Sequence, residues 1–313
     1  MSGRTFVATV PESLSGVRID RAVALLTGVS RSTAAALVAG GQVLLDGGPV
    51  ASRSRPLAAG AVLSVELPEP VAIVPDRSVA FSVVFEDEAL VIVDKPPGVI
   101  VHPGAGRRDG TLVAGLLARY PDLAEVGDPT RPGVVHRLDR GTSGLLAVAR
   151  TPEAHAALGA QLRARTAGRR YVALVTGHVA SDRGVVDAPI GRSDRMPTRM
   201  AVSVTGRPAR TTYEVLRRLD VLMGEQGAVE APATLLACSL ETGRTHQIRV
   251  HLSAIGHPVV GDDRYGGTTR RILRPGRVFL HAAELSLDHP VSGERMSWTS
   301  ELPTDLRLVL GRD

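Results

Sequence analysis

The chain has 313 residues, of which 43% are hydrophobic and 22% charged, a composition typical of a globular protein with one large core and a smaller module. No apolar run approaches the ~20 residues that a membrane-spanning helix needs, and the first residues lack the apolar segment of a signal peptide, so we expect a cytoplasmic protein without a membrane partner. A single cysteine, Cys238, excludes an intrachain disulfide and a cysteine-based metal site, while the net charge of +5 does not by itself decide whether the partner is a nucleic acid.

The first segment with a regular pattern runs over residues 17–68. Ser30 is a good N-cap for a helix, and Gly40-Gly41 ends that helix. A proline-rich stretch follows and indicates a linker. We therefore predict a module over residues 1–70, with its core at 17–68, and a linker over 71–78. The expected elements are helices over 18–26 and 31–38, a hairpin over 42–48 and a strand over 61–67.

From residue 79 onward, short apolar strands outnumber helices and do not alternate with them one for one. This order argues against a doubly wound parallel sheet and predicts an α+β domain over residues 79–313, built on a mixed, mostly antiparallel sheet. Thr151 and Pro152 are typical of a helix start, and the polar residues over 220–232 predict a loop. We expect strands over 89–93, 145–149, 170–175 and 233–237, and helices over 152–162 and 245–255.

Asp139 lies in the segment His136-Arg137-Leu138-Asp139-Arg140, between two arginines and after the apolar pair Val134-Val135, which we interpret as the end of a strand. Nearby positive charge favours an ionised carboxylate. Taken alone, such a segment is typical of a surface salt bridge at a turn. The following Thr142-Ser143-Gly144 also predicts a turn, because Ser143 lacks the Gly-x-Ser-x-Gly pattern of a serine nucleophile.

Four further segments accompany Asp139 in a definite order along the chain. They are Asp94-Lys95-Pro96-Pro97-Gly98 with Val101-His102-Pro103, Arg170-Tyr171-Val172-Ala173, Gly243-Arg244-Thr245-His246-Gln247-Ile248-Arg249-Val250-His251, and Leu280-His281-Ala282 with His289-Pro290. Together with the segment around Asp139, they resemble the ribosomal-RNA pseudouridine synthases of the RluA type over essentially the whole chain. Two departures are Asp94, where asparagine is usual, and Arg170, where the commoner lysine is absent.

The resemblance implies a pseudouridine synthase fold and an isomerase that uses no cofactor and no metal. Its reaction breaks the C1′–N1 bond of a uridine and joins C5 to C1′, which needs an ionised carboxylate near the sugar, as nucleophile or as base. By resemblance this carboxylate is Asp139, held by an ion pair with Arg249, and Tyr171 stacks on the uracil.

The target base has to leave the RNA stack to be reached, as in other base-modifying enzymes. Arg137 and His136, next to Asp139, are expected to fill the vacated space, and Arg244 is expected to bind a phosphate or a loop. His246 and His251 are five residues apart and have no accompanying carboxylate cluster, so we expect no metal site.

The first module resembles the S4-type RNA-binding module, which makes the chain similar to the RluD-like members of the family. The matching motifs are Arg18-Ile19-Asp20, Ser30-Arg31-Ser32, Gly41-Gln42-Val43-Leu44-Leu45-Asp46-Gly47 and Gly60-Ala61-Val62-Leu63, with Asp46 and Ala61 as departures. The resemblance implies that the chain binds large-subunit (23S) ribosomal RNA and that arginines of this module contact its phosphates. These arginines are Arg18, Arg31, Arg53 and Arg55. We expect the protein to be a monomer.

The sequence leaves open whether the substrate is free ribosomal RNA, an assembling ribosomal particle or transfer RNA. A second interpretation is an RNA chaperone or assembly factor that has lost chemistry, but a domain that only binds has no need of Asp139, Tyr171 and Arg249 together. A third is a glycosidase-like carboxylate enzyme. Such enzymes generally use two acids, and no second acid accompanies Asp139 in these segments.

Overall fold

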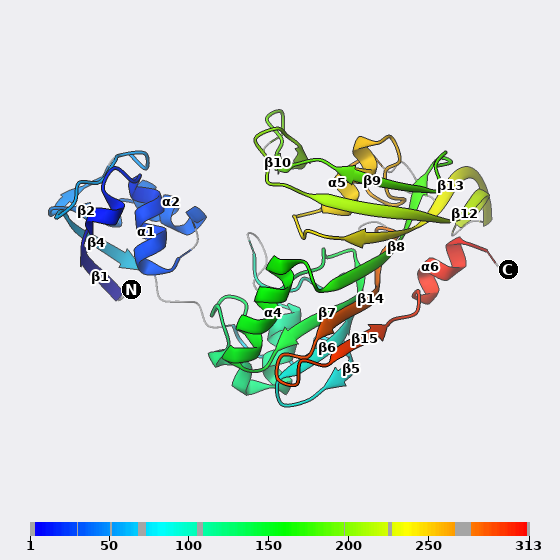
Figure 1. Ribbon diagram of the computed structural model, residues 1–313, viewed down its shortest axis with the longest axis horizontal. Coiled ribbons are helices and arrows are strands. Elements are labelled where there is room, and N and C mark those ends of the chain that lie inside the picture. Colours follow the sequence, from blue (N-terminus) through cyan, green and yellow to red (C-terminus); the bar gives the residue numbers. More distant parts are fainter. Residues whose placement is uncertain are drawn as a thin grey trace. The chain divides into compact units, whose positions relative to one another are not determined.

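The structure of the chain is a computed structural model that describes residues 4–29, 31–50, 52–67, 73–104, 109–196, 198–224, 227–266 and 277–311. The chain divides into two compact units, Met1–Val71 and Ala72–Asp313 (Figure 1). Each unit has a hydrophobic core of its own. Among the described residues, no helix is long and apolar enough to cross a membrane.

The first unit packs two short helices against an antiparallel sheet of order β1-β4-β2-β3. Ile19 and Leu37 from the helices meet Val43 and Leu63 from the sheet in its core. The predicted helices, hairpin and last strand are confirmed, whereas β1, which pairs with β4 along its whole length, was not predicted, and Ser30 lies outside the described residues. The elements are β1 (Arg4–Thr9), η1 (Glu12–Leu14), α1 (Ile19–Thr27), α2 (Arg31–Ala39), β2 (Val43–Leu45), β3 (Gly48–Pro49) and β4 (Val62–Leu67).

The second unit is built on a nine-stranded sheet of order β5-β6-β7-β14-β8-β13-β12-β9, with β15 paired to β14. β14 pairs with β7 in parallel, and the other described pairs of this sheet are antiparallel, which confirms a mixed, mostly antiparallel sheet. The strands are β5 (Ser82–Glu86), β6 (Leu90–Lys95), β7 (Ser143–Ala149), β8 (Gly168–Thr176), β9 (Arg183–Asp187), β12 (Arg210–Gly224), β13 (Gly227–Leu240), β14 (Leu280–Asp288) and β15 (Arg295–Thr299), besides the separate hairpin β10 (Ile190–Arg192) and β11 (Met200–Val202).

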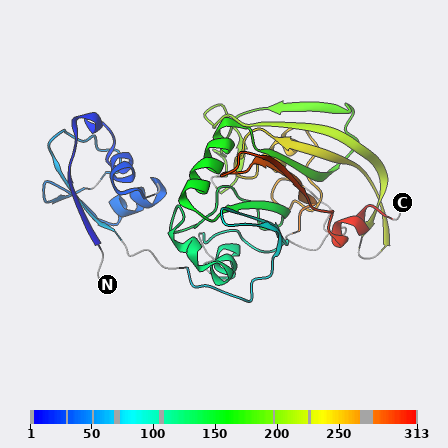
Figure 2. The ribbon, with the colours of Figure 1, turned by 60° about the horizontal axis from the view of Figure 1, so that its bottom comes forward.

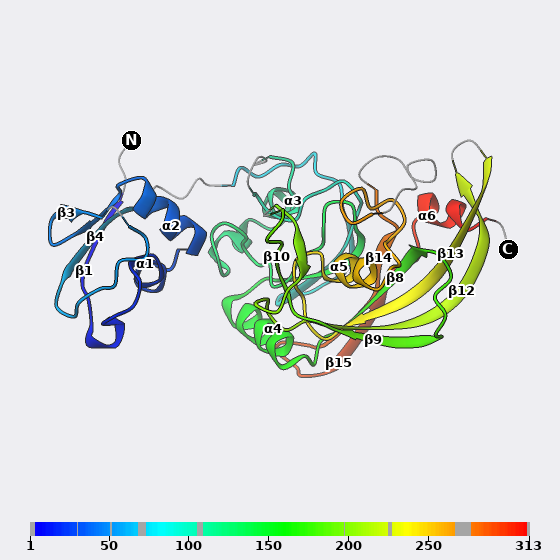
Figure 3. The ribbon, with the colours of Figure 1, turned by 90° about the horizontal axis from the view of Figure 1, so that it is seen from above.

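Helices cover this sheet and join its strands. α4 (Pro152–Ala164) packs against β7 and β14 (Figure 2), and the side chain of Thr151 accepts a hydrogen bond from the backbone N–H of Ala154, as expected of an N-cap. α5 (Gln247–Ala254) packs against β11 and β12, beside the long curved hairpin of β12 and β13 (Figure 3). The remaining helices are α3 (Leu112–Arg119), η2 (Pro121–Glu125) and α6 (Thr304–Val309).

The centre of the sheet fixes the loop that carries Asp139. β7 is buried at every position, as its apolar run predicts, and its first residues pair with β14. Gly144 has a φ of 112°, and a Cβ there would collide with the backbone of Ala282, so only glycine allows this close approach. The loop of residues 134–142 therefore ends at a rigid point of the core.

Three local predictions are wrong. Val134 forms only an isolated bridge with Val148 and does not end a strand. Ser143 and Gly144 begin β7 instead of forming a turn. The described part of residues 220–232 continues the β12–β13 hairpin, and residues 225 and 226 lie outside the described residues. In each case the partner strand decides the conformation, and its position is not visible in the local pattern.

Candidate active site

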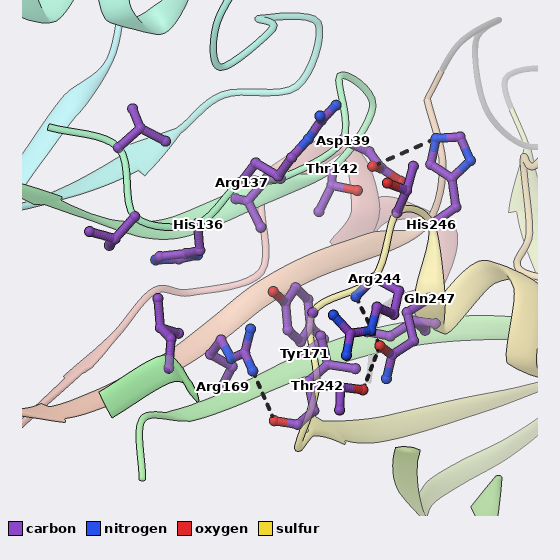
Figure 4. Close-up of a pocket in the computed structure, with 18 of the residues that line it drawn as sticks. His136, Arg137, Asp139, Thr142, Arg169, Tyr171, Thr242, Arg244, His246 and Gln247 are labelled. Atoms are coloured by element: carbon purple, nitrogen blue, oxygen red, sulfur yellow. Dashed lines mark hydrogen bonds and ion pairs between the residues drawn. The ribbon is translucent and has the colours of Figure 1, made fainter. Parts of the chain in front are cut away.

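A cavity of about 600 Å³ opens between the loop before β7, the first half of β8 and the turn that leads into α5 (Figure 4). Its volume is in the range of ordinary small-molecule sites. Eight arginines and three carboxylates line it, so the wall carries a surplus of positive charge. The arginines are Arg131, Arg137, Arg163, Arg165, Arg169, Arg207, Arg244 and Arg249, and the acids are Asp128, Asp139 and Glu241.

Asp139 belongs to a chain of three charged side chains. Arg249, on α5, donates from Nη1 to Asp139 Oδ2 at 2.8 Å, and its Nε and Nη2 donate to the two oxygens of Asp262 at 2.7 and 2.9 Å. Asp262 is fully buried. Burial alone would lower the pKa of Arg249, but the hydrogen bonds and charges of Asp262 and Asp139 raise it above its ordinary value. The predicted ion pair between Asp139 and Arg249 is present, and Asp262 holds the arginine in place.

The two arginines that flank Asp139 in the sequence do not hold its carboxylate, although the local pattern favoured them as its source of positive charge. Among the described residues neither forms an ion pair with it: Arg140 donates from Nε to the carbonyl of Gly98 at 3.1 Å, and Arg137 lies at the cavity wall. The carboxylate turns instead toward α5 (Figure 4), so its counterion comes from a segment more than a hundred residues later.

His246 lies on the other oxygen of Asp139, with Nε2 3.7 Å from Oδ1. It precedes α5 in a left-handed conformation, with a φ of 57°. Its Nδ1 lies 2.8 Å from the hydroxyl of Tyr265, which accepts the backbone N–H of Met200 at 3.2 Å. Tyr265 can therefore give its own hydrogen to Nδ1. Burial lowers the pKa of His246, and a neutral ring that accepts at Nδ1 carries its hydrogen on Nε2, facing Asp139.

Tyr171 lies on β8 in the interior of the cavity, between Asp139 and Arg169 (Figure 4). Tyr171 is 6% exposed. Burial raises the pKa of Tyr171, and the charge of Asp139 adds to this effect against that of Arg169, so the phenol stays protonated near neutral pH. The structure thus brings Asp139, Arg249 and Tyr171 to one cavity.

His136 and Arg244, two other predicted residues, also line this cavity but are tied to the backbone. His136 Nε2 accepts the N–H of Ala147 at 3.0 Å, and burial, with the nearby charge of Arg169, lowers its pKa to about 3. This fixed neutral ring is ill suited to fill the space of a flipped base. Arg244 donates from Nε to the carbonyl of Pro208 at 3.0 Å.

The first unit carries the other predicted arginines, outside this cavity. Arg18 is exposed and binds Asp20 through Nε and Nη2 at 3.1 and 2.8 Å. Arg53 and Arg55 are exposed. Arg31 begins α2, but its side chain lies outside the described residues.

Comparison with known proteins identifies the second unit. Residues 89–254, more than half of the chain, match the family model described as RNA pseudouridylate synthase. The chain belongs to this family. A member of it is an isomerase that acts on RNA, and the mixed sheet with its cavity is the pseudouridine synthase fold.

Relatives of this RNA pseudouridylate synthase extend over nearly its whole length. It is 43% identical to the ribosomal large subunit pseudouridine synthase D of Nitrosomonas europaea, over 98% of this chain and 87% of the relative. It is 42% identical to the protein of the same name from Pseudomonas aeruginosa, over 97% and 94%. Among solved structures, human RNA pseudouridylate synthase domain containing 1 aligns with a TM-score of 0.58 and 30% identity, over 76% of this chain and 93% of that one.

Several residues of the site escaped the sequence reasoning. Asp262 stands beside Asp263, and the sequence does not tell which of the two is buried. His246 was considered only as a metal ligand, and Arg169 and Tyr265 were not considered. No cluster of three metal-binding side chains occurs in the part of the chain that the structure describes.

Proposed function

We propose that this RNA pseudouridylate synthase modifies uridines of large-subunit ribosomal RNA and that Asp139 is its catalytic residue. One observation supports the residue above all: Asp139, paired with Arg249 at 2.8 Å, lies in the same arginine-lined cavity as Tyr171. The names of two relatives at 42–43% identity support the class of RNA.

The reaction needs only an ionised carboxylate at the sugar. The C1′–N1 bond breaks, the uracil turns, C5 joins C1′, and the hydrogen of C5 is lost while N1 gains one, so no oxidant or energy donor is consumed. Asp139 acts at the sugar as nucleophile or as base. Arg249 orients it through Oδ2, and the Nε2–H of His246 faces Oδ1. Both carboxylate oxygens of Asp139 are thus oriented by side chains of α5 and of the residue that precedes it.

Two further side chains complete this proposal. Tyr171 offers its ring face to the uracil, and its protonated hydroxyl can give a hydrogen bond to the base. Arg137, which has no ion pair with Asp139, is the residue that we propose to occupy the space left in the RNA stack when the uridine flips out. Because His136 is bound to β7, we do not assign it this role.

We also propose that the first unit is an S4-like docking module, with its exposed Arg53 and Arg55 on RNA phosphates. Arg18 is partly neutralised by Asp20 and contributes less. The protein would then act as a cytoplasmic monomer on free ribosomal RNA or on an assembling particle.

The experiment that tests this function is carbodiimide-stop mapping of pseudouridine. Unmodified ribosomal RNA and transfer RNA are each incubated with the full-length protein, wild type beside Asp139→Asn, with chelator present and no cofactor. Asparagine removes the charge with little change in volume, so the variant should bind RNA as wild type does and form no pseudouridine.

New stops in large-subunit RNA with wild type alone would support both the substrate and the residue. Stops only in transfer RNA would contradict the substrate, and stops with Asp139→Asn would contradict the residue. Tight RNA binding without stops in either RNA would favour an RNA-binding factor instead.

A further inference from the structure

Arg169 is a buried cation that the proposed chemistry does not use. It lies on β8 two residues before Tyr171, so both side chains point to the same side of the sheet. Arg169 is 8% exposed. Nη2 makes a long hydrogen bond of 3.4 Å to the carbonyl of Leu240, and Nε has no partner among the described residues.

The carboxylates in the cavity wall are all bound to other arginines. Asp128 binds Arg131 at 3.2 Å, and Asp139 binds Arg249. The third, Glu241, binds Arg210 at 3.1 Å and lies 3.6 Å from Arg165. Among the described residues Arg169 therefore has no acidic partner.

A buried guanidinium without an anion is costly, because it gives up water and gains no opposite charge. The surrounding backbone nevertheless accommodates it: a Cβ on Gly243 would lie 2.8 Å from Nη1 of Arg169. Because glycine has no side chain, Gly243 leaves room for the guanidinium of Arg169. The fold thus keeps an uncompensated cation inside a cavity, an arrangement that suits a site whose anion arrives with the ligand.

We propose that Arg169 binds a phosphodiester group that flanks the target uridine. This inference rests on the proposed function, under which the flipped nucleotide enters this cavity. Uracil is neutral, so in RNA the anion must come from the backbone. Two residues along a strand are about 7 Å apart, a distance that one nucleotide can span with its base on Tyr171 and a phosphate on Arg169. Guanidinium also binds phosphate through two hydrogen bonds at once.

The first test concerns the free protein and does not depend on turnover. Arg169→Gln should be as stable to heat as wild type or more stable, because it removes an unpaired buried charge. Inorganic phosphate should raise the Tm of wild type more than that of Arg169→Gln. Arg183→Gln, which removes an exposed arginine on β9 that pairs with Glu214 at 2.7 Å, is the matched control and should respond to phosphate as wild type does. A strongly destabilised Arg169→Gln, or equal gains in Tm, would overturn the proposal.

The second test locates the phosphate. Each linkage around the uridine that wild type modifies is replaced in turn by a neutral methylphosphonate, and kcat/KM is measured. We expect one flanking linkage to cost wild type roughly 10- to 100-fold, the effect of one charged hydrogen-bonded contact. On RNA with only natural phosphate linkages, the kcat/KM of Arg169→Gln should be lower than that of wild type by about the same factor. The methylphosphonate at that linkage should lower it no further, and Arg169→Lys should recover part of the lost kcat/KM.

If Arg169→Gln shows the same penalty as wild type at every linkage, the inference fails although the enzyme is active. If wild type modifies no RNA, the proposed function fails, and the phosphate-dependent Tm still decides whether Arg169 binds an anion.

Discussion

Replacing Asp262 by asparagine separates the role of this residue from that of Asp139. Asp262 is fully buried, and Oδ1 accepts the backbone N–H groups of Arg264 and Tyr265 at 3.0 and 3.2 Å besides a bond from Arg249. An asparagine oxygen in the place of Oδ1 can keep this turn and the bond from Nη2 of Arg249, but the amide group in the place of Oδ2 then faces the Nε–H of Arg249, which is also a donor. The variant loses both a charge and an acceptor.

The magnitudes follow from burial and from the number of bonds broken. Breaking a buried ion pair by removing one partner costs about 3–5 kcal/mol of unfolding free energy, so we expect a loss in this range for Asp262→Asn. In Asp139→Asn, Arg249 keeps both bonds to Asp262, and the replaced side chain is 16% exposed. One charged hydrogen bond is weakened there, which should cost less than about 2 kcal/mol.

Urea unfolding at neutral pH measures these losses, and pseudouridine formation is followed at a temperature where each variant is fully folded. Asp262→Asn should lower kcat at least about tenfold, because a misplaced Arg249 no longer aims Asp139. Asp263→Asn, an exposed neighbour, is the control and should change stability by less than about 1 kcal/mol. Wild-type kcat in Asp262→Asn, or equal stability losses in the Asp262 and Asp139 variants, would refute the idea that Asp262 holds the arginine.

Three further changes test other parts of the molecule. The double variant Arg53→Gln/Arg55→Gln should weaken RNA binding and reduce the slope of log K against log salt by roughly 0.7–0.9 for each phosphate that is no longer neutralised, in a filter-binding titration. Burial, followed by the charge of Arg277, lowers the pKa of Lys95 from 10.5 to about 7. The unfolded chain therefore holds this proton over a pH range where the folded chain has released it. Wild type should gain about 3–5 kcal/mol of stability between pH 7 and pH 10 that Lys95→Met does not gain, as measured by urea unfolding. Thr142→Val should raise the free energy of unfolding by about 1 kcal/mol, because the buried hydroxyl has no partner among the described residues; a loss of stability would contradict this.

Local patterns predicted the elements of the fold because the forces behind them are local. The apolar run of residues 145–149 became a strand buried on both faces, and Thr151 caps α4 through its own side chain. Resemblance to the family singled out Asp139, Tyr171 and Arg249, and the structure brings all three to one cavity. These residues could be predicted because the resemblance depends on several segments and on their order along the chain, and not on one local pattern.

What could not be predicted depends on contacts between distant segments. The start of β7 lies beside β14 because Gly144 pairs with Ala282, and no local pattern indicates that partner. The counterion of Asp139 was indicated by the resemblance to the family, as Arg249, and not by the local pattern. In that pattern Arg140 is the nearer cation, but its side chain donates to the carbonyl of Gly98.

In the proposed mechanism, the ion pairs of Arg249 set the net charge that faces the sugar of the uridine. A simple pair of Asp139 with Arg249 would be neutral, but Arg249 is bound by two carboxylates, so the group of three keeps one net negative charge beside the sugar. As the C1′–N1 bond breaks, positive charge develops at C1′, and a fixed negative group stabilises it. The wall arginines that form no ion pair among the described residues oppose this effect until phosphates of the RNA neutralise them. The phosphates of the RNA therefore contribute to the stabilisation of the transition state. Uridine offered as a free nucleoside, without phosphates, should be a far poorer substrate, with a lower kcat as well as a higher KM.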